Sequence, residues 1–251
     1  MELKIKIHDG PGRMGNIREI KTPWLIDENK INIVGNQGSA YDIQREIAEW
    51  SVELTNKMAK EFINSEKYEK DNINLAIVQG SKYLDLRIKS INKLEKMGYN
   101  GFIIANGDDL ILHPQNLVDF IVNLRESINP NSYLIFPFAE GSFIPLLSYM
   151  GIDGFLDGIA NYYSYLNVLI TPTKNYDLNE YNLLKLKQEE LLVKNKKHLE
   201  FILAEVREHI KNGTLRNLVE ERSTTSPQNA TALKLLDANH QSYLEKYTQL
   251  Y

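Results

Sequence analysis

The chain has 251 residues, and its hydrophobic fraction of 43% and charged fraction of 25% are ordinary for a globular protein. These values exclude a largely disordered chain and a fibrous repeat. The sequence contains no cysteine, which excludes disulfides, thiol nucleophiles and thiolate metal ligands. The formal net charge is −4, which argues against strong unaided binding to nucleic acid but permits a local basic patch.

No apolar run reaches the roughly 18 residues that a transmembrane helix needs. The N-terminus alternates charged and apolar side chains, whereas a signal peptide needs a continuous apolar stretch. We therefore expect a cytoplasmic protein without membrane contact. No two of the five histidines stand at an HExxH-type spacing, so we expect no metal site and no cofactor.

The first element expected in chain order is a small β-hairpin. Residues 3–7 alternate apolar and polar side chains with a period of two, and residues 9–12 form a strong turn signal. A second extended piece, residues 15–20, completes the hairpin, and Trp24 follows as an expected core residue.

A long amphipathic helix is expected from about Asp42 to Ile63, with Ser39 as its N-cap. Apolar side chains recur in it at spacings of three and four, which places them on one face. The residues expected on this core-facing side are Ile43, Ile47, Trp50, Leu54, Met58 and Phe62.

After this helix, short apolar runs alternate with helical segments, which is typical of βα units around a parallel sheet. A closed (β/α)₈ barrel has eight such units and about 250 residues. Here the alternation occupies only residues 32–165, so the expected fold class is α/β, a reduced or incomplete TIM-type barrel. The expected strands are 32–35, 75–78, 102–105, 133–136 and 154–156, and the expected helices are 83–97, 113–127 and 143–150.

From Leu178 onward the pattern is helical only, with Gly213 as an interruption and Ser226-Pro227 at the start of the last helix. We therefore expect two parts. Residues 1–175 form the barrel domain with its N-terminal hairpin, and residues 176–251 form a C-terminal helical segment packed on the barrel.

Candidate functional residues follow the expected strands, because active sites of parallel α/β folds gather at the carboxyl ends of the strands. The candidates are Gln79, Gly80, Asn106, Gly107, Asp108, Asp109, Glu140 and Asp157.

Each candidate also has a purely structural interpretation. The Gln79 amide suits a base edge, or it bonds its own loop. Asp108 and Asp109 suit paired acid–base chemistry, or they cap a helix. Asp157 suits a nucleophile or general base, or it is a solvated loop acid.

A basic cluster lies in the expected helix that begins at Leu178. Lys194, Lys196 and Lys197 suit phosphate contacts. Acidic residues surround the cluster, so a solvated helix face is the alternative interpretation.

Several segments resemble motifs of tRNA-guanine transglycosylases. Residues 9–15 and 21–23 are similar to the opening "DG-A-R-x-G … TP", and residues 78–87 resemble "VQGG-x-Y-x-DLR". Residues 97–102, 149–155 and 206–215 resemble "LGFDGYA", "GIDMFD" and "IRxxIxxGxL". The matches are in order along the chain, and the archaeal archaeosine synthase branch is the most similar.

The chain also departs from this family pattern. The "DSGGFQ" motif of the first catalytic aspartate is missing, and Leu156 stands where the nucleophilic aspartate is expected, one residue before Asp157. A shift of one residue in a strand turns a side chain to the opposite face. Ala105-Asn106 replaces the glycine pair that contacts the base, and the zinc cysteines have no counterpart.

The resemblance implies a TIM-type barrel that takes part in archaeosine synthesis, with tRNA and a further protein subunit of that pathway as partners. For a transferase, the strand-end positions and the resemblance together predict the following roles. Asp157, Asp108 and Asp109 are the catalytic candidates, Gln79, Gly80, Asn106, Gly107 and Glu140 bind the base, and Lys194, Lys196 and Lys197 bind RNA.

Two other interpretations stay open. One is a catalytically degenerate scaffold or tRNA-binding subunit that completes a partner enzyme as a hetero-oligomer. The other is an unrelated small-molecule enzyme on a similar barrel, since fold does not determine function.

Overall fold

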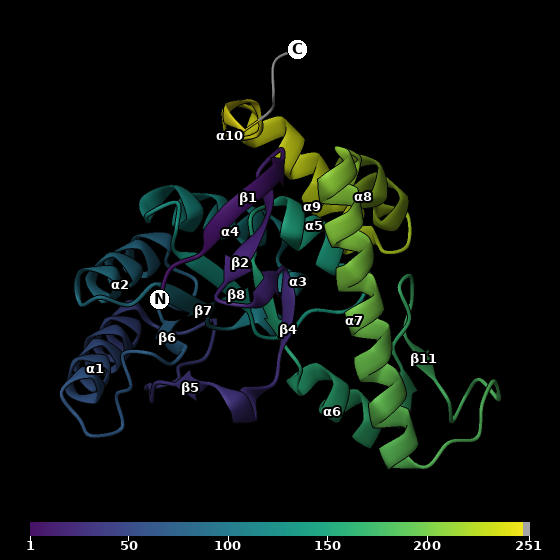
Figure 1. Cartoon of the computed structure of the whole chain (residues 1–251), viewed down its shortest axis with the longest axis horizontal. Helices are drawn as coiled ribbons and strands as arrows, with labels where there is room; N and C mark the ends of the chain where they lie inside the picture. Colours follow the sequence, from purple (N-terminus) through teal and green to yellow (C-terminus); the bar gives the residue numbers. More distant parts are fainter. Residues whose placement is uncertain (248–251) are drawn as a thin grey trace.

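A parallel sheet of six strands, curled into a half-barrel, forms the centre of the computed structural model (Figure 1), which describes residues 1–247. Its strand order is β4-β9-β8-β7-β6-β5. The six strands are β4 (Trp24–Ile26), β5 (Asn32–Ile33), β6 (Asn74–Val78), β7 (Gly101–Ile104), β8 (Tyr133–Phe136) and β9 (Gly154–Leu156). The expected reduced TIM-type barrel is confirmed.

β4 and β5 are the two edge strands of this sheet, although they are neighbours in the sequence. β4 pairs with β9, β5 pairs with β6, and residues 27–31 connect the two edges through the short turn η1 (Glu28–Lys30). Each strand of a closed (β/α)₈ barrel has two neighbours. The barrel is therefore open between β4 and β5, and β4 belongs to the sheet rather than to the N-terminal hairpin.

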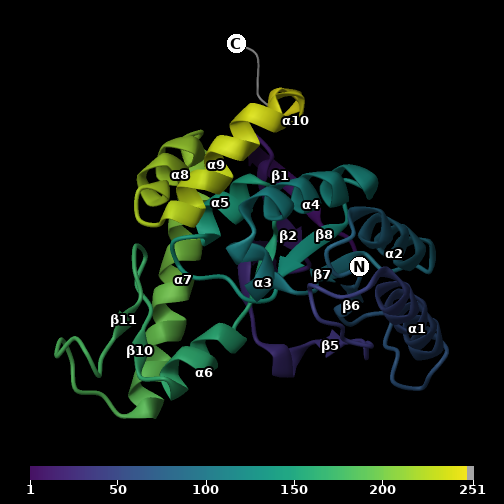
Figure 2. The same ribbon diagram turned by 180° about the vertical axis from the view of Figure 1, so that it is seen from behind.

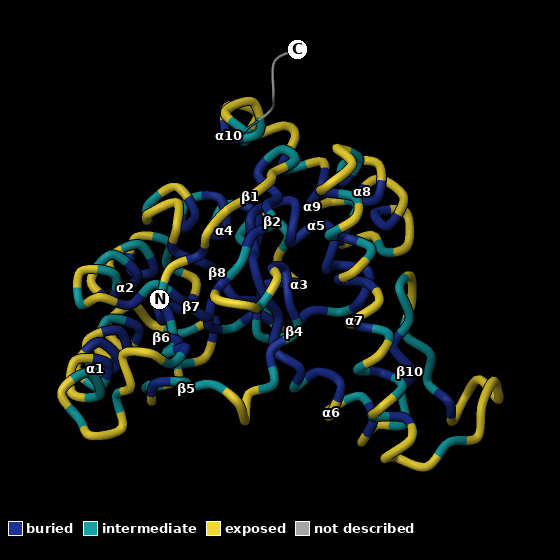
Figure 3. The backbone as a smooth tube through the Cα atoms, in the orientation of Figure 1, coloured by how far each residue is buried: buried dark blue, intermediate teal, exposed yellow. Residues whose placement is uncertain are grey.

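The two faces of the sheet are covered by different parts of the chain. Side chains alternate along the strands, so Phe102 and Ile104 of β7 face the helices while Ile103 faces the N-terminal strands. Figure 3 shows the strands of the half-barrel as buried throughout most of their length. The helices on the outer face are α1 (Arg45–Ile63), α2 (Leu84–Lys96), α3 (Gly107–Leu112), α4 (Pro114–Ser127), α5 (Ile144–Tyr149) and α6 (Gly158–Tyr165).

The expected N-terminal hairpin is confirmed and has a third strand. β1 (Lys4–Asp9), β2 (Gly12–Ile17) and β3 (Ile20–Thr22) form an antiparallel sheet of their own. Leu3, just before β1, and Ile17 of β2 are buried in the same cluster as Trp24 of β4. The hairpin thus covers the inner face of the half-barrel.

The helices after residue 214 gather at one end of the half-barrel, and the long helix before them runs along its side (Figure 2). Asp9 of β1 accepts a hydrogen bond from the Leu215 backbone nitrogen at 2.7 Å, which joins the hairpin to the start of α8. The C-terminal part of the chain contains the helices α7 (Gln188–Asn212), α8 (Leu215–Ser223), α9 (Pro227–Asn239) and α10 (Gln241–Lys246). The short strands β10 (Val168–Leu169) and β11 (Tyr176–Asp177) precede them. The last four residues of the expected C-terminal segment lie outside the described residues.

The expected helix from Leu178 to Lys211 is wrong at its start, because α7 begins at Gln188. Asp177 accepts hydrogen bonds from the following turn, including one from the Asn179 backbone nitrogen at 2.8 Å. A side chain that bonds its own backbone two residues later favours a turn over a helix. Residues 178–187 are therefore an irregular segment.

The prediction that Trp50 lies on the core-facing side of α1 is also wrong. Trp50 is 54% exposed, and the buried side carries small or polar residues instead. The reason is a polar contact: the Ser51 hydroxyl donates to the Gln37 carbonyl at 2.5 Å, and the Gln37 nitrogen donates to the Thr55 hydroxyl at 3.0 Å. The N-cap of α1 is Gln44 rather than the expected Ser39. The Ser39 hydroxyl lies instead 2.9 Å from the Ser81 hydroxyl.

A buried ion pair joins the hairpin to the barrel. Arg13 of β2 donates from Nε and Nη2 to the two carboxylate oxygens of Asp153, both at 2.7 Å. Asp153 has no exposed surface and Arg13 only 7%. The same Asp153 oxygen that meets Nη2 accepts the Leu134 backbone nitrogen of β8 at 2.9 Å.

Replacing Arg13 by Met removes both direct hydrogen bonds to the buried Asp153 carboxylate and leaves Arg125, 3.9 Å away, as its remaining cation. We expect the free energy of unfolding to fall by about 3–5 kcal/mol. Urea unfolding measures this change. The double variant Arg13→Met, Asp153→Leu should lose less than the sum of the single variants. Arg45→Met is the matched control, because its partner Asp85 is exposed and the expected loss is at most about 1 kcal/mol.

Candidate functional site

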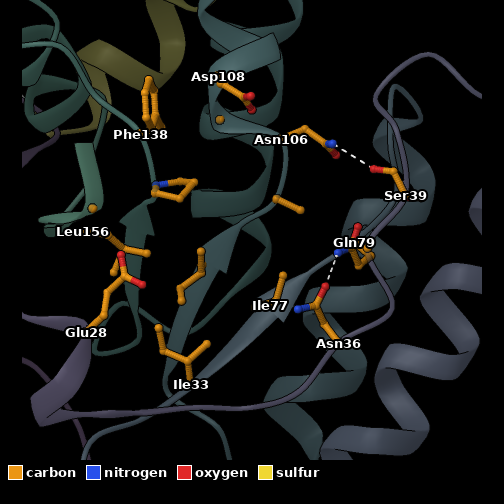
Figure 4. A pocket seen from close by; sticks show the side chains of 16 residues that line it. Glu28, Ile33, Asn36, Ser39, Ile77, Gln79, Asn106, Asp108, Phe138 and Leu156 are labelled. Atoms are coloured by element: carbon orange, nitrogen blue, oxygen red, sulfur yellow. Dashed lines mark hydrogen bonds between the residues drawn. The ribbon is translucent and has the colours of Figure 1, made fainter. Parts of the chain in front are cut away.

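A cavity of about 530 Å³ opens at the carboxyl ends of the barrel strands (Figure 4). Its floor is apolar, made by Ile33, Ile77 and Ile103 from the inner face of β5, β6 and β7. The segments after each of the six strands make its walls. The walls include Glu28, Asn36, Ser39, Gln79, Asn106, Gly107, Asp108, Phe138, Leu156 and Gly158.

Gln79, at the end of β6, is the most deeply buried polar side chain of the cavity, with 2% of its surface exposed. Its Nε2 donates to Asn36 Oδ1 at 2.8 Å, a contact drawn in Figure 4. Its Oε1 is buried and has no hydrogen-bond partner among the described residues. A buried acceptor without a donor is costly, so this atom is ready for a ligand N–H or O–H group.

Asn106, after β7, uses its side chain to hold the cavity wall together. Its Oδ1 accepts from Arg87 at 3.2 Å and its Nδ2 donates to the Ser39 carbonyl at 3.0 Å. The backbone of Asn106 is left-handed, with φ of 59°. Both polar atoms of this amide therefore have partners within the protein.

Arg87 of α2 organises the loops around Asn106 and Gln79. It is fully buried and donates to the carbonyls of Ser81 at 2.8 Å and Ala105 at 2.9 Å. Burial lowers the pKa of Arg87 to about 10. Gly80 lies against it, since a Cβ at Gly80 would stand 2.6 Å from Arg87 Cγ. Arg87 is thus a positioning residue for two sides of the cavity.

Leu156 and Asp157 lie on opposite sides of the end of β9. Leu156 lines the cavity, whereas Asp157 is buried outside its lining and forms an ion pair with Lys196 Nζ at 2.6 Å. The hydrogen bond to Asp157 raises the pKa of Lys196. The carboxylate of Asp157 is thus neutralised by α7 rather than presented to the cavity.

Glu28, in the turn after β4, supplies a carboxylate to the cavity wall beside Leu156 (Figure 4). Partial burial, followed by the charge of Asp157, raises its pKa, while a hydrogen bond from the Gly158 backbone opposes this shift. A Cβ at position 158 would stand 2.7 Å from Glu28 Oε1. Glycine at the start of α6 is therefore what lets the carboxylate approach.

Of the predicted site residues, the structure brings Gln79, Asn106, Gly107 and Asp108 together in this cavity. The others lie outside its lining. Glu140 accepts a hydrogen bond from the Tyr163 hydroxyl at 2.8 Å, and the Asp109 carbonyl lies 2.8 Å from His113 Nδ1. Gly80, Lys194 and Lys197 also lie outside the lining.

Sequence reasoning missed Glu28 and Asn36, and the strand-end rule that found Gln79 would have found both. Glu28 follows β4 and Asn36 follows β5. A strand was expected at residues 32–35, so the same rule applied there gives Asn36 directly. β4 has only three residues, too few for an alternation to be recognised, so Glu28 became visible only once the sheet was assembled.

The zinc site that the family resemblance implies does not fit this chain. Cysteine is absent, and no cluster of at least three histidine, aspartate or glutamate side chains suitable for a metal occurs within residues 1–247. On α7, Asn195 is buried and bonds the backbone: its Oδ1 accepts from the Ile170 backbone nitrogen at 2.8 Å.

Comparison with known proteins identifies the family of the chain. The family model described as queuine tRNA-ribosyltransferase matches residues 31–189, more than half of the chain. The chain belongs to this transglycosylase family. Its match includes five of the six barrel strands and most of the cavity wall.

Relatives within the transglycosylase family include archaeal proteins. An archaeosine synthase of Methanocaldococcus jannaschii is 35% identical over 70% of the chain and 28% of its own length. The archaeosine synthase subunit alpha of Thermococcus kodakarensis is 26% identical over 99% of the chain and 43% of its length. A tRNA-guanine(15) transglycosylase of Pyrococcus furiosus is 30% identical over 82% of the chain and 38% of its length. The chain thus spans less than half the length of each of these relatives.

No helix within residues 1–247 has the length and apolar character needed to cross a membrane.

The ionised carboxylate of Glu28 is expected to lower the stability of the folded protein at neutral pH. Its folded-state pKa lies above the ordinary value of 4.5, so the folded state binds the proton more tightly and stability falls as pH rises through that window. Glu28→Gln should therefore raise the Tm at pH 7, and the gain should disappear below pH 4.5, where both states are protonated. Thermal unfolding at the two pH values checks this; a lower Tm at pH 7 would contradict it.

Proposed function

We propose that this chain recognises a 7-deazaguanine base of tRNA as a component of archaeosine synthesis. Membership of the transglycosylase family supports this function, as do relatives named archaeosine synthase and tRNA-guanine(15) transglycosylase. The cavity lies at the carboxyl ends of parallel strands, the usual position of ligand sites in such folds.

The observation that carries the proposal is the buried, unpartnered Oε1 of Gln79 in this cavity. Its neighbour Asn36 fixes the amide through Nε2, so Oε1 is left for the ligand. A flat heterocycle with N–H donors satisfies this acceptor and rests on the apolar floor.

Recognition rather than covalent base exchange is the chemistry that the site favours. A covalent intermediate needs a nucleophile in contact with the ligand. Leu156 occupies the cavity at the end of β9, while Asp157 is paired with Lys196 outside the lining. We therefore propose that Asp157 stabilises the α6–α7 contact, and that Asp108 and Glu28 are the carboxylates that meet a bound base.

We propose that the phosphates of the tRNA stay outside the cavity. Its lining carries no lysine, arginine or histidine among the described residues. Lys194 and Lys197 on α7 remain our candidates for contacts to phosphate, since Lys196 is occupied by Asp157.

We propose further that the chain acts with another protein. The relative from Thermococcus kodakarensis is named as a subunit, and it matches nearly the whole of this chain. In this hetero-oligomer the partner supplies the catalytic groups, while the cavity of this chain recognises the base.

Gln79→Leu is expected to weaken the binding of free 7-cyano-7-deazaguanine by about tenfold or more, because it removes the buried acceptor at nearly constant volume. Isothermal titration calorimetry measures the affinity. Gln188→Leu is the control, since this glutamine is exposed on α7 and does not line the cavity. Equal affinities for the Gln79 variant and the wild type would contradict the assigned role.

Asp157→Asn is expected to leave the affinity for the base within about threefold of wild type, because Asp157 does not line the cavity. Isothermal titration calorimetry measures this affinity.

A turnover assay with the same variant follows the nucleoside by mass spectrometry after incubation with tRNA that contains 7-cyano-7-deazaguanine. We expect conversion only when the other enzymes of the pathway are present, equally with wild type and Asp157→Asn. Release of the base by this chain alone, abolished in the variant, would show covalent exchange instead.

A further inference from the structure

The helix α1, next to the opening of the half-barrel, carries an apolar stripe that this chain leaves partly uncovered. The stripe consists of Ile47, Trp50, Leu54 and Met58 of α1 and of Ile43 just before the helix. We propose that this stripe docks an amphipathic helix of a partner protein with lysine or arginine along its border. The proposed docking rests on the association with another protein proposed above and is independent of base recognition by the cavity.

The stripe lies on the side of α1 that faces away from α2. On the α2 side, Arg45 forms an ion pair with Asp85 at the start of α2. At about 100° per residue, Ile47, Trp50 and Leu54 lie roughly 140–180° around the helix from Arg45. Figures 1 and 2 show α1 at the outer end of the helix layer, with α2 as its neighbour. The stripe therefore faces the place where a further helix of the layer would lie.

The opening of the barrel explains why no further helix follows there. In a closed barrel the helices form a complete outer ring, but β5, the strand before α1, is an edge strand. The Asn32 nitrogen donates to the Ile73 carbonyl at 3.0 Å, and the Val34 nitrogen donates to the Leu75 carbonyl at 2.9 Å. The peptide groups of Ile33 between them point away from β6, into the opening. The strand layer and the helix layer thus end on the same side of the molecule.

The exposed part of the stripe has the composition of a protein interface. Trp50 is 54% exposed and Ile47 is 43% exposed, while Ile43, Leu54 and Met58 are half-buried along the same line. Apolar side chains at spacings of three and four are the anchors by which one helix packs against another. Tryptophan is among the residues that contribute most to the affinity of protein interfaces. The stripe therefore fits a partner helix better than it fits solvent.

The charges beside the stripe determine which helix fits it. Glu46 and Glu53 stand four residues before and three residues after Trp50, and neither has an ion pair among the described residues. The cation on the same border, Lys57, lies 3.9 Å from the Glu61 carboxylate. The border of the stripe is therefore acidic. A partner helix with lysine or arginine at the facing positions gains ion pairs there, and such pairs determine the choice of partner in helix packing.

A second copy of this chain is disfavoured by the same charges. A two-fold pairing of two α1 helices about Trp50 places Glu46 of one copy beside Glu53 of the other, and it does so twice. Like charges that face each other across a helix pair oppose association. The acidic border thus favours a different protein with a basic border over self-association.

A synthetic peptide replaces the partner in the test. It has the sequence of residues 42–63 with Glu46→Lys, Glu53→Lys and Trp50→Phe, so that its border is basic and its stripe is kept. The reference peptide carries Trp50→Phe alone. We expect the basic peptide to bind the full chain about tenfold more tightly than the reference, as measured by isothermal titration calorimetry. The emission of Trp50 should shift to shorter wavelength, while Trp24 is already buried.

Three variants of the full chain locate the binding. Ile47→Lys places a charge in the stripe and should weaken binding of the basic peptide by about tenfold or more. Val193→Lys is the matched control, because it makes a similar change at an exposed aliphatic residue of α7, and it should bind like the wild type. The double variant Glu46→Gln, Glu53→Gln should reduce the preference for the basic peptide to less than about threefold.

The turnover assay with the other enzymes of the pathway tests the same surface with the natural partner. Ile47→Lys should lower conversion by about tenfold, while its affinity for free 7-cyano-7-deazaguanine stays within about threefold of wild type, because Ile47 does not line the cavity. Val193→Lys should keep both.

The outcomes keep the docking surface separate from the proposed function. Equal binding of the two peptides, or full conversion by Ile47→Lys, overturns the docking surface and leaves base recognition intact. A dimer of the wild type in size-exclusion chromatography with light scattering, dissociated by Ile47→Lys, identifies a second copy as the occupant and also overturns the proposed partner. Failure of the wild type to bind the free base overturns base recognition, and the peptide titration still decides the docking surface.

Discussion

The buried pair of Arg13 and Asp153 is the contact on which the positions of the other elements depend. Asp153 lies immediately before β9 and also accepts the Leu134 nitrogen of β8, so one carboxylate holds the hairpin and two barrel strands together. Arg13 in addition donates to the carbonyls of Ser132 and Pro130 before β8. A buried charge pair tolerates little displacement, because any separation leaves a charge unpaired in a low dielectric. The start of β9 is thereby fixed, and with it Leu156 and Gly158 at its other end.

The open barrel determines which acid reaches the cavity. Because only residues 27–31 lie between β4 and β5, the chain crosses the opening in a short turn, and that turn carries Glu28. At the same time the register of β9 directs Asp157 toward α7 and Leu156 inward. The carboxylate beside β9 therefore comes from a different strand than the family pattern implies.

Two neighbouring amide side chains of the cavity differ in how far their hydrogen-bonding groups have partners within the protein. Asn106 has both of its polar atoms satisfied, by Arg87 and by the Ser39 carbonyl. Gln79 has one atom satisfied, by Asn36, and one buried without a partner. Folding normally pairs buried polar groups, so the unpaired acceptor distinguishes Gln79 from Asn106. The buried Arg87 makes this arrangement rigid, since it bonds three loop oxygens at once.

The sequence by itself determined the βα alternation, the hairpin, the four central strands and Gln79 as a strand-end candidate, because these depend on local periodicity and on turn residues. It did not determine that Trp50 faces solvent, because Ser51 and Thr55 bind a loop that is distant in sequence. It also left Glu28 unnoticed and did not distinguish a solvated Asp157 from a catalytic one. Those questions depend on the pairing of β4 with β9 and of Asp157 with Lys196, contacts between residues far apart in the chain. Only the tertiary structure brings such residues together, and so it alone decided which side chains face the cavity.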